Sequence, residues 1–330
     1  MADPVLGLYT SDDIASEALR TEFMDSVRLY NEEARDFRTE LCKITTDNTV
    51  RVRQRSMRFE RMGSDTALPD FQHQDYAEIA IAKAVRYGLR SGMTAAAWEE
   101  EHPDADTLRG IHKESLAADR RLTTQLVLYP MLIDGGWYDA TMTVVPPPYA
   151  MNTFLTTHDH YLVADAEGIP AYTHFTYGKR HIQEHGFGMT TNNATRLVAF
   201  INGVQAEYIE NVADWVDATN TRMDTELLEV LQKLGLTPSF TVAGIAVVKN
   251  DWIPENYMTI FDPGEKVGRY RVTDNPTTRE LIVYMEEDGV QYKGLGSYIR
   301  WGKVGVALRG AGITYYLGDD AWTDPTGFEV

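Results

Sequence analysis

Cysteine is nearly absent from this sequence, since Cys42 is the only one among 330 residues. A single cysteine excludes an internal disulfide framework and most cysteine-ligated metal sites, and it fits a reducing compartment. Long apolar runs are absent too, because the most apolar stretch, LVLYPMLI at 126–133, is far shorter than the roughly 20 residues that cross a bilayer. The opening residues, MADPVLGLYTSDD, lack the basic and apolar regions of a signal peptide. We therefore expect a cytoplasmic protein without a membrane segment.

Positive charge is also scarce. Lys and Arg number 31 against 49 Asp and Glu, which gives a formal net charge of −18. A field of this sign repels a phosphate backbone and argues against broad nucleic-acid binding. Apolar residues make up 43% of the chain and aromatic residues 11%, which excludes global disorder and is sufficient for a globular core.

The motifs of nucleophilic and nucleotide-dependent enzymes are missing as well. The sequence contains no G-x-S-x-G and no G-x-x-x-x-G-K-[ST]. Cys42 lies in a predicted charged helix with no histidine near it in sequence. The glycines of GKVGVALRGAG at 302–312 fall between predicted strands and not before a helix. We therefore expect a protein without enzymatic activity and without a cofactor.

Histidine concentration is the one feature with catalytic potential. Five of the eight histidines lie between residues 158 and 185, and His181-Ile-Gln-Glu184-His185 fits the H-x-x-E-H motif of inverted zinc peptidases. On a helix, His181 and His185 share a face and can reach one Zn²⁺, with Glu184 as general base. However, Gly186 places His185 at a helix end, where histidines without a metal are also favoured by the helix dipole. A zinc hydrolase site and a purely structural role are therefore both open.

The first ninety residues predict a helix followed by a long hairpin. Apolar residues recur at three-, four- and five-residue steps over 10–45, which is typical of a helix. Because most of its circumference is charged, we expect this helix to pack on a neighbouring chain. The period then changes to two, and TVRVRQRSMRF at 49–59 and YAEIAIAKAVRYGLRSG at 76–92 predict two strands with a long loop between them. Such a hairpin has few large apolar residues and is poorly stable alone.

A long helix is the next strong feature. Residues 104–133 carry an apolar stripe at three- and four-residue steps, and Asp104 or Asp106 can cap its start. A strand at 137–145 and three prolines at 146–148 follow, and the prolines indicate a boundary.

Short elements alternate in the middle of the chain, and strands dominate its end. The pattern predicts helices near 174–185, 203–213 and 223–234, and strands at 196–201, 241–249 and 257–262. From 267 to 317 the chain reads almost entirely as strand. The fold class predicted from this order is α+β.

In this serial order the whole chain resembles a major capsid protein of the tailed bacteriophages (Caudoviricetes), with the Hong Kong 97-type fold. The hairpin called the E-loop in that family is similar to TVRVRQRSMRFERM and YAEIAIAKAVRYG, and its spine helix to PDADTLRGIHKESLAADRRLTTQLVLYPML. THDHYL, HIQEHGFG and LVAFIN are similar to the entry into the axial domain. NDWIPENYMTIFD and YKGLGSYIRWGKVGVALRGAGITYYL are similar to the later strands.

The resemblance implies a division of the chain into six parts. These are an N-terminal arm at 1–46, an E-loop hairpin at 47–92, a peripheral domain at 93–147 with its spine helix at about 104–133, an axial domain at 148–266, a β-rich return to the peripheral domain at 267–318, and a C-terminal tail at 319–330. No scaffolding-like segment precedes the arm, so we expect any scaffold to be a separate protein.

The resemblance also implies the function. Copies of the chain would form the hexamers and pentamers of an icosahedral virion shell around double-stranded DNA, assembled in the host cytoplasm. The implied partners are other copies of the chain, a portal, a scaffold, possible decoration proteins, and DNA by non-specific proximity, with no membrane. The histidines would then be structural. The alternative is an encapsulin, a compartment of the same fold that holds cargo protein. Chemical cross-linking between subunits is not implied, because its Lys, Asn and acid have no matched positions here.

Charged residues of the hairpin and the return are the candidate contacts between subunits. The basic candidates lie on the first hairpin strand: Arg51, Arg53, Arg55, Arg58 and Arg61. We expect them to pair with acidic surface on a neighbour, and the acidic candidates are Asp65, Asp70, Glu286, Glu287 and Asp288. Each exposed pair contributes only about 0–1 kcal/mol, but a repeated network fixes the register of neighbouring subunits.

Overall fold

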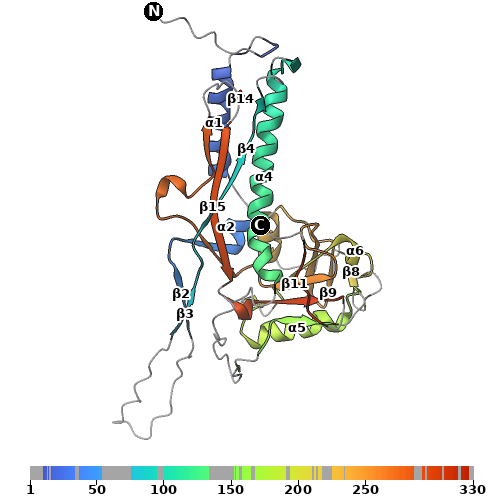
Figure 1. The fold of residues 1–330 in the computed structure, drawn as a ribbon. Coiled ribbons are helices and arrows are strands. Elements are labelled where there is room, and N and C mark those ends of the chain that lie inside the picture. Colours follow the sequence, from blue (N-terminus) through green and yellow to red (C-terminus); the bar gives the residue numbers. More distant parts are fainter. Residues whose placement is uncertain are drawn as a thin grey trace, which may run out of the picture. The chain divides into compact units, whose positions relative to one another are not determined.

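The structure of the protein is a computed structural model with two compact units, which are described separately (Figure 1). The first unit comprises residues 1–36, 83–124 and 272–303, and the second comprises 37–82, 125–271 and 304–330. The structure describes residues 10–12, 14, 16–33, 37–53, 76–94, 98, 100–133, 152, 154–155, 158–164, 168–190, 194–209, 212, 215–217, 225–233, 235–285, 292–293, 296–306, 308–318 and 321–326.

Two helices dominate the first unit. These are α1 (Ser16–Glu33) and the greater part of α4 (Ala105–Leu132), which is drawn in green in Figure 1. Asp104 caps α4, since its Oδ1 accepts the backbone N–H of Thr107 at 2.8 Å. Pro130 lies inside the last turn without ending the helix. The long helix predicted from the apolar stripe is therefore confirmed.

An apolar face of α1 packs on α4 of the same chain. Leu19 and Phe23 are buried together with Leu108 of α4, and Val27 and Tyr30 continue the same buried face. These α1 residues recur at four- and three-residue steps, which places them on one side of the helix. The expectation that the helix packs on a neighbouring chain is therefore wrong for its apolar face, because that face has a partner within its own chain.

Antiparallel strands and a 3₁₀ helix complete the described part of the first unit: β4 (Val85–Arg90), β5 (Met93–Thr94), η2 (Pro276–Thr278), β13 (Ile282–Met285), β14 (Tyr292–Lys293) and the greater part of β15 (Gly296–Val306). β15 pairs with β13 on one side and with β4 on the other, and β14 pairs with β5. Side chains alternate across a strand, so Tyr298 and Arg300 of β15 share a face. That face lies against α4, where the two side chains contact His112 and Asp119.

A seven-stranded mixed sheet forms the centre of the second unit. Its order is β6-β16-β11-β7-β10-β9-β8. The strands are β6 (Tyr161–Val163), β7 (Val198–Ile201), β8 (Trp215–Asp217), β9 (Phe240–Val242), β10 (Ile245–Lys249), β11 (Tyr257–Phe261) and β16 (Gly312–Tyr316). The pairs β6–β16 and β7–β10 are parallel. β7, β11 and β16 are buried along their whole length, as the apolar runs of the sequence require.

In the described part of the second unit, the sheet is accompanied by the helices α2 (Phe37–Leu41), α5 (Tyr172–Glu184), α6 (Gly203–Ala206) and α7 (Thr225–Lys233) and by the 3₁₀ helix η3 (Arg309–Ala311). Phe175 and Ile182 of α5 are fully buried in one cluster with Ile260 of β11 and Ile313 of β16. Gly178 allows this close packing, because a Cβ atom there would lie 2.8 Å from Ile260 Cδ1 and 3.4 Å from Ile313 Cγ2.

Replacing Gly178 by valine is expected to lower the free energy of unfolding by about 1–3 kcal/mol, since the added atoms overpack the core between α5 and the sheet. The matched control is Gly110→Val, because Gly110 is an exposed glycine of α4 and a Cβ atom added there would have no other atom within 4 Å. That control should change stability by no more than about 0.5 kcal/mol. Urea unfolding of both variants checks the difference, and equal stabilities would contradict the packing role of Gly178.

The segment after α2 departs from the prediction. Residues 42–45, expected at the end of the first helix, form strand β1 (Cys42–Thr45), which pairs in parallel with β12 (Gly268–Arg271). A strand partner so distant in sequence overrides local helical periodicity. The following hairpin is confirmed where it is described, since β2 (Thr49–Arg53) pairs antiparallel with β3 (Tyr76–Ala80).

Two further predicted elements differ. The single strand expected at 241–249 is the hairpin β9–β10, whose two-residue turn has Ala243 at φ 53° and Gly244 at φ 79°, the positive values of a tight hairpin turn. The helix expected near 203–213 is only α6, followed by turns. The predicted strand at 137–145 and the prolines at 146–148 lie outside the described residues. None of the helices in the described part of the chain combines the length and apolar character of a bilayer crossing.

Candidate functional site

The β2–β3 hairpin is the first candidate contact surface. The register places Arg51 opposite Glu78, and Arg51 Nε donates a hydrogen bond to Glu78 Oε1 at 3.0 Å. Both side chains are more than half exposed, at 73% and 53%, so this cross-strand pair contributes about 0–1 kcal/mol. Among the described residues, β2 and β3 form a sheet of two strands with no third partner. A two-stranded sheet is marginally stable in water, so the hairpin needs support at its base or from another surface.

The base of the hairpin is tied to β12. Ile81, which follows β3, is buried, and its N–H donates to the Asn48 carbonyl at 2.8 Å. Arg271 Nη1 of β12 donates to the Ile81 carbonyl at 2.7 Å. Within the second unit, these bonds attach the open end of the hairpin, where β2 begins and β3 ends, to β12.

A buried ion pair in the first unit holds β15 to α4. Arg300 Nε and Nη2 donate to the two carboxylate oxygens of Asp119 at 2.8 and 2.5 Å, and the Tyr30 hydroxyl donates to Oδ2 at 2.9 Å. Burial, with the Asp119 carboxylate next, raises the pKa of Tyr30 well above its usual value, so the hydroxyl keeps its proton. Arg300 is 1% exposed, and its Nη1 also donates to Glu280 Oε2 at 3.3 Å. The bidentate arrangement with Asp119 fixes both orientation and register of β15 on the helix.

His112 makes a second polar bridge in the same unit. Its Nδ1 lies 2.6 Å from the Tyr298 hydroxyl and its Nε2 bonds to the Ser26 hydroxyl, so one ring links α4 to β15 and to α1. Burial lowers the pKa of His112, while Glu22 opposes this effect. A neutral imidazole has one donor and one acceptor nitrogen, which matches its two hydroxyl partners. A cavity of about 230 Å³ lies next to both bridges.

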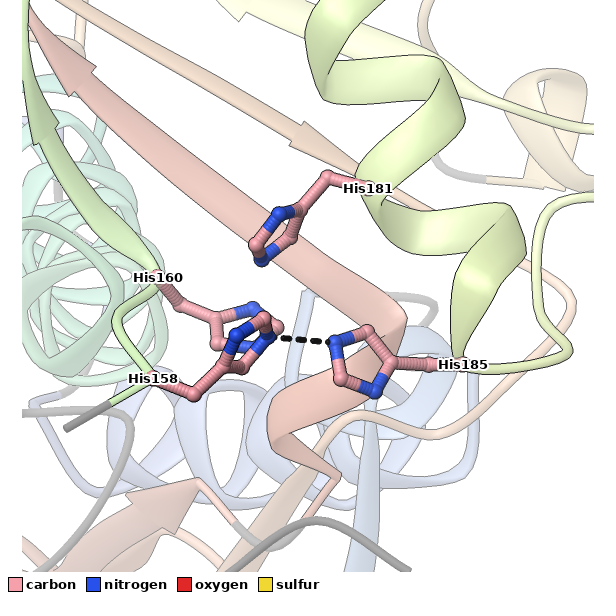
Figure 2. A group of neighbouring side chains, drawn as sticks. All are labelled: His158, His160, His181 and His185. Carbon is pink, nitrogen blue, oxygen red and sulfur yellow. Dashed lines mark hydrogen bonds between the residues drawn. The ribbon is translucent and has the colours of Figure 1, made fainter. Parts of the chain in front are cut away.

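Four histidines meet in the second unit (Figure 2). His158 and His160 come from the segment that leads into β6, while His181 lies in the last turn of α5 and His185 caps that helix. One nitrogen from each ring can be chosen so that all four atoms lie within 4.8 Å of one another. His160, His181 and His185 are buried, and His158 is half-buried. The predicted pair His181 and His185 is therefore part of a larger cluster.

Glu184, the general base expected from the H-x-x-E-H motif, does not belong to this cluster. Its Oε1 lies 3.6 Å from Arg180 Nε, and its side chain is 42% exposed. Residues i and i+3 on a helix share a face, so Glu184 could lie beside His181, but the His181 imidazole turns toward His158 and His160 instead. Among the described residues, this group consists of four imidazoles and contains no carboxylate, so Glu184 lacks the place that the zinc hydrolase interpretation gives to its general base.

Known proteins resemble this chain in structure and not in sequence. No protein-family model matches the sequence, and no curated protein matches it. Solved structures do match. A chain of Mycobacterium phage Patience aligns with a TM-score of 0.68 at 19% identity, covering 98% of this chain and 95% of that one. A chain of the mature capsid of bacteriophage PhiM1 has a TM-score of 0.52 at 10% identity, covering 85% and 86%. A chain of the capsid of cyanophage P-SCSP1u has a TM-score of 0.52 at 11% identity, covering 86% and 88%.

The chain has the Hong Kong 97-type capsid fold of tailed bacteriophages. The predicted fold class, α+β, and the predicted resemblance are both confirmed. Within this Hong Kong 97-type fold, α4 occupies the residues predicted for the spine helix, and β2 and β3 occupy those predicted for the E-loop hairpin.

The candidate contact residues of the Hong Kong 97-type chain are only partly described. Arg51 has an acceptor, Glu78, within its own hairpin. Arg53 is the last residue of β2. The remaining candidates lie outside the described residues: Arg55, Arg58, Arg61, Asp65, Asp70, Glu286, Glu287 and Asp288. Their role between subunits stays a prediction.

Sequence reasoning missed the buried ion pair. Asp119 follows Ser115 by one helical turn and therefore lies on the apolar stripe that predicted the long helix, where a carboxylate is unusual. This position was a signal that a buried cation would face it. Arg300 carried no such signal, because it stands between apolar residues in a strand that also contains the polar residues Ser297 and Lys303.

Proposed function

We propose that this protein is the major capsid protein of a tailed bacteriophage, whose copies form the hexamers and pentamers of an icosahedral shell enclosing double-stranded DNA. The observation that carries the proposal is the fold likeness to phage capsid chains, with a TM-score of 0.52 over at least 85% of both chains. The role is structural: the chain positions contacts between copies and performs no reaction.

The described surface supports repeated association. The β2–β3 hairpin has no third strand among the described residues, and Met24 and Tyr284 are each 55% exposed although both are apolar. Neighbouring copies that cover such groups would gain hydrophobic stabilisation. A subunit that contacts several neighbours turns modest pairwise interfaces into a collectively strong lattice, because each further contact is effectively intramolecular.

The proposal also includes the partners of the capsid protein and the compartment in which it assembles. Assembly in the host cytoplasm would involve a portal, a separate scaffold and, in some particles, decoration proteins. DNA would be held by proximity and not by specific contacts, since the net charge of −18 disfavours wide contact with phosphates.

Expression of the full chain followed by negative-stain electron microscopy tests the proposal. We expect closed shells, tubes or isolated capsomers, because association is the intrinsic property of such a subunit. A concentrated sample that remains monomeric by analytical ultracentrifugation would contradict the proposal. Particles isolated from the natural source should contain DNA, whereas particles that enclose a cargo protein and no DNA would favour the encapsulin alternative.

A further inference from the structure

The four imidazoles of the histidine cluster are brought together from two separate parts of the second unit. Figure 2 shows His181 and His185 reaching from α5 toward His158 and His160, with the four rings around a common space. The six distances between ring centroids run from 4.6 Å, for His158 and His181, to 5.4 Å, for His181 and His185. Four histidines in mutual contact are a donor set for a transition-metal ion, since imidazole nitrogen is a common ligand of zinc.

We propose that His158, His160, His181 and His185 form a closed, four-coordinate zinc site that fastens the segment before β6 to the end of α5. Structural zinc sites have four protein ligands and tetrahedral geometry, whereas catalytic sites keep one position open for water. With four imidazoles and Glu184 turned to Arg180, this cluster has the ligand number of the first kind. The inference concerns the stability of the second unit and does not depend on the proposed function.

The distances fit such a site after small side-chain rotations. Zn–N bonds of about 2.0–2.1 Å place the four nitrogens of a tetrahedral site about 3.3–3.4 Å apart. In the structure, Nε2 of His158 and Nε2 of His185 lie 2.9 Å apart, and the widest spacing within the set of four atoms is 4.8 Å. Contraction of the widest pair by about 1.5 Å is within reach of rotation about χ2 of histidine, which is a broad torsion.

The bond between His160 and Gly312 selects the correct ligand atom. His160 Nδ1 lies 2.6 Å from the Gly312 carbonyl oxygen, and because a carbonyl only accepts, Nδ1 must carry the proton. The other nitrogen, Nε2, is therefore the unprotonated one, which is the form of imidazole nitrogen that binds a metal. A ligating histidine commonly donates its second ring N–H to a backbone carbonyl in this way, which fixes its tautomer and orientation. Gly312 is the first residue of β16, so the site would also be braced by the central sheet.

The surroundings of the cluster favour a cation, and three of its four histidines are buried. His181 lies in the last turn of α5 and His185 is its C-cap, and the C-terminal end of a helix carries partial negative charge. The Phe154 ring stacks on His185 with 4.0 Å between centroids, and the Tyr177 ring stacks on His181 at 5.8 Å. These rings pack against two of the four imidazoles. A zinc ion held by four neutral imidazoles would therefore be stabilised by the partial negative charge at the end of α5.

Metal analysis of the full-length chain tests the site. Protein stripped with a chelator and dialysed against ZnCl₂ should retain about one zinc ion per chain, and CoCl₂ should give the visible absorption bands of tetrahedral cobalt. His158→Gln, at the half-buried position, should weaken zinc binding by at least about tenfold while circular dichroism stays unchanged. The double variant H158Q/H181Q should bind no zinc and show no cobalt bands. Zinc should raise the melting temperature of the wild type and not of the double variant.

The matched control is His102→Asn. His102 is an exposed histidine of the first unit with φ 42°, and asparagine tolerates this left-handed conformation. Its zinc content and cobalt spectrum should equal those of the wild type. The proposal is overturned if wild-type chain retains less than about a tenth of a zinc ion per chain, or if the folded double variant binds zinc as the wild type does.

Discussion

Replacing Asp119 by alanine is expected to lower the free energy of unfolding by about 3–5 kcal/mol, because it leaves Arg300 as a buried charge without its carboxylate. Arg300 loses two charge-assisted hydrogen bonds, at 2.8 and 2.5 Å, and Tyr30 loses its acceptor at 2.9 Å. Glu280 is a weaker partner, because its side chain is 44% exposed and its Oε2 lies 3.3 Å from Arg300 Nη1. Urea unfolding of the unassembled chain measures the loss.

A matched exposed pair provides the control for Asp119. Arg109 donates to Glu22 with a similar bidentate geometry, at 2.8 and 2.9 Å, but the two side chains are 40% and 47% exposed. Glu22→Ala should therefore cost no more than about 1 kcal/mol. The double variant Asp119→Leu with Arg300→Met removes both charges and should recover most of the stability, as apolar replacements of buried pairs do. Equal losses for Asp119→Ala and Glu22→Ala would show that burial does not strengthen the pair.

On the proposed capsid function, reversing the charge of the arginines in the segment predicted to be the E-loop is expected to abolish shell formation while the subunit stays folded. The variant carries glutamate at Arg53, Arg55, Arg58 and Arg61 and keeps Arg51, because Arg51 already pairs with Glu78 in its own hairpin. Four reversed charges on every copy would place like charges against the acidic surface of each neighbour, and repetition over the lattice multiplies the repulsion. Sedimentation and negative-stain microscopy measure the yield of particles.

Two further variants test whether the charge of these side chains, and not the guanidinium group itself, is needed for assembly. Lysine at the same four positions keeps the positive charge and should still assemble. Lysine at Glu286, Glu287 and Asp288 in the charge-reversed background should restore particles, because attraction then returns with opposite signs. Normal assembly of the charge-reversed chain would eliminate these arginines as contacts between subunits.

The parts of the fold that the sequence predicted well are those with long, regular patterns. The apolar stripe over 104–133 predicted α4 to within one residue at each end, because a helix of this length repeats its signal many times. The change of period from three or four to two located the β2–β3 pairing for the same reason. The serial order of these elements then carried the resemblance to phage capsid proteins, which no single motif could.

The parts that were missed depend on partners distant in sequence. Cys42–Thr45 continues a helical pattern locally, and its strand character comes from pairing with β12. The histidine motif predicted only His181 and His185. The spacing of residues on a helix gives no information about which other segment of the chain packs beside that helix. His158 and His160 were within the same histidine-rich stretch, but only the fold brings them to α5. Burial and long-range pairing are properties of the folded chain, so local pattern alone cannot assign them.

The late position of β16 in the sequence determines when the sheet of the second unit can be completed during synthesis. Among the described residues β6 pairs only with β16, and β16 lies about 150 residues later in the chain. A ribosome adds about 5–20 residues per second, so β6 waits about 8–30 s for its partner. A chain released before residue 312 would leave both β6 and the neighbouring edge of β11 bare. Unpaired sheet edges are sites of aggregation and degradation, so placing a late strand inside the sheet makes a stable second unit depend on the complete chain.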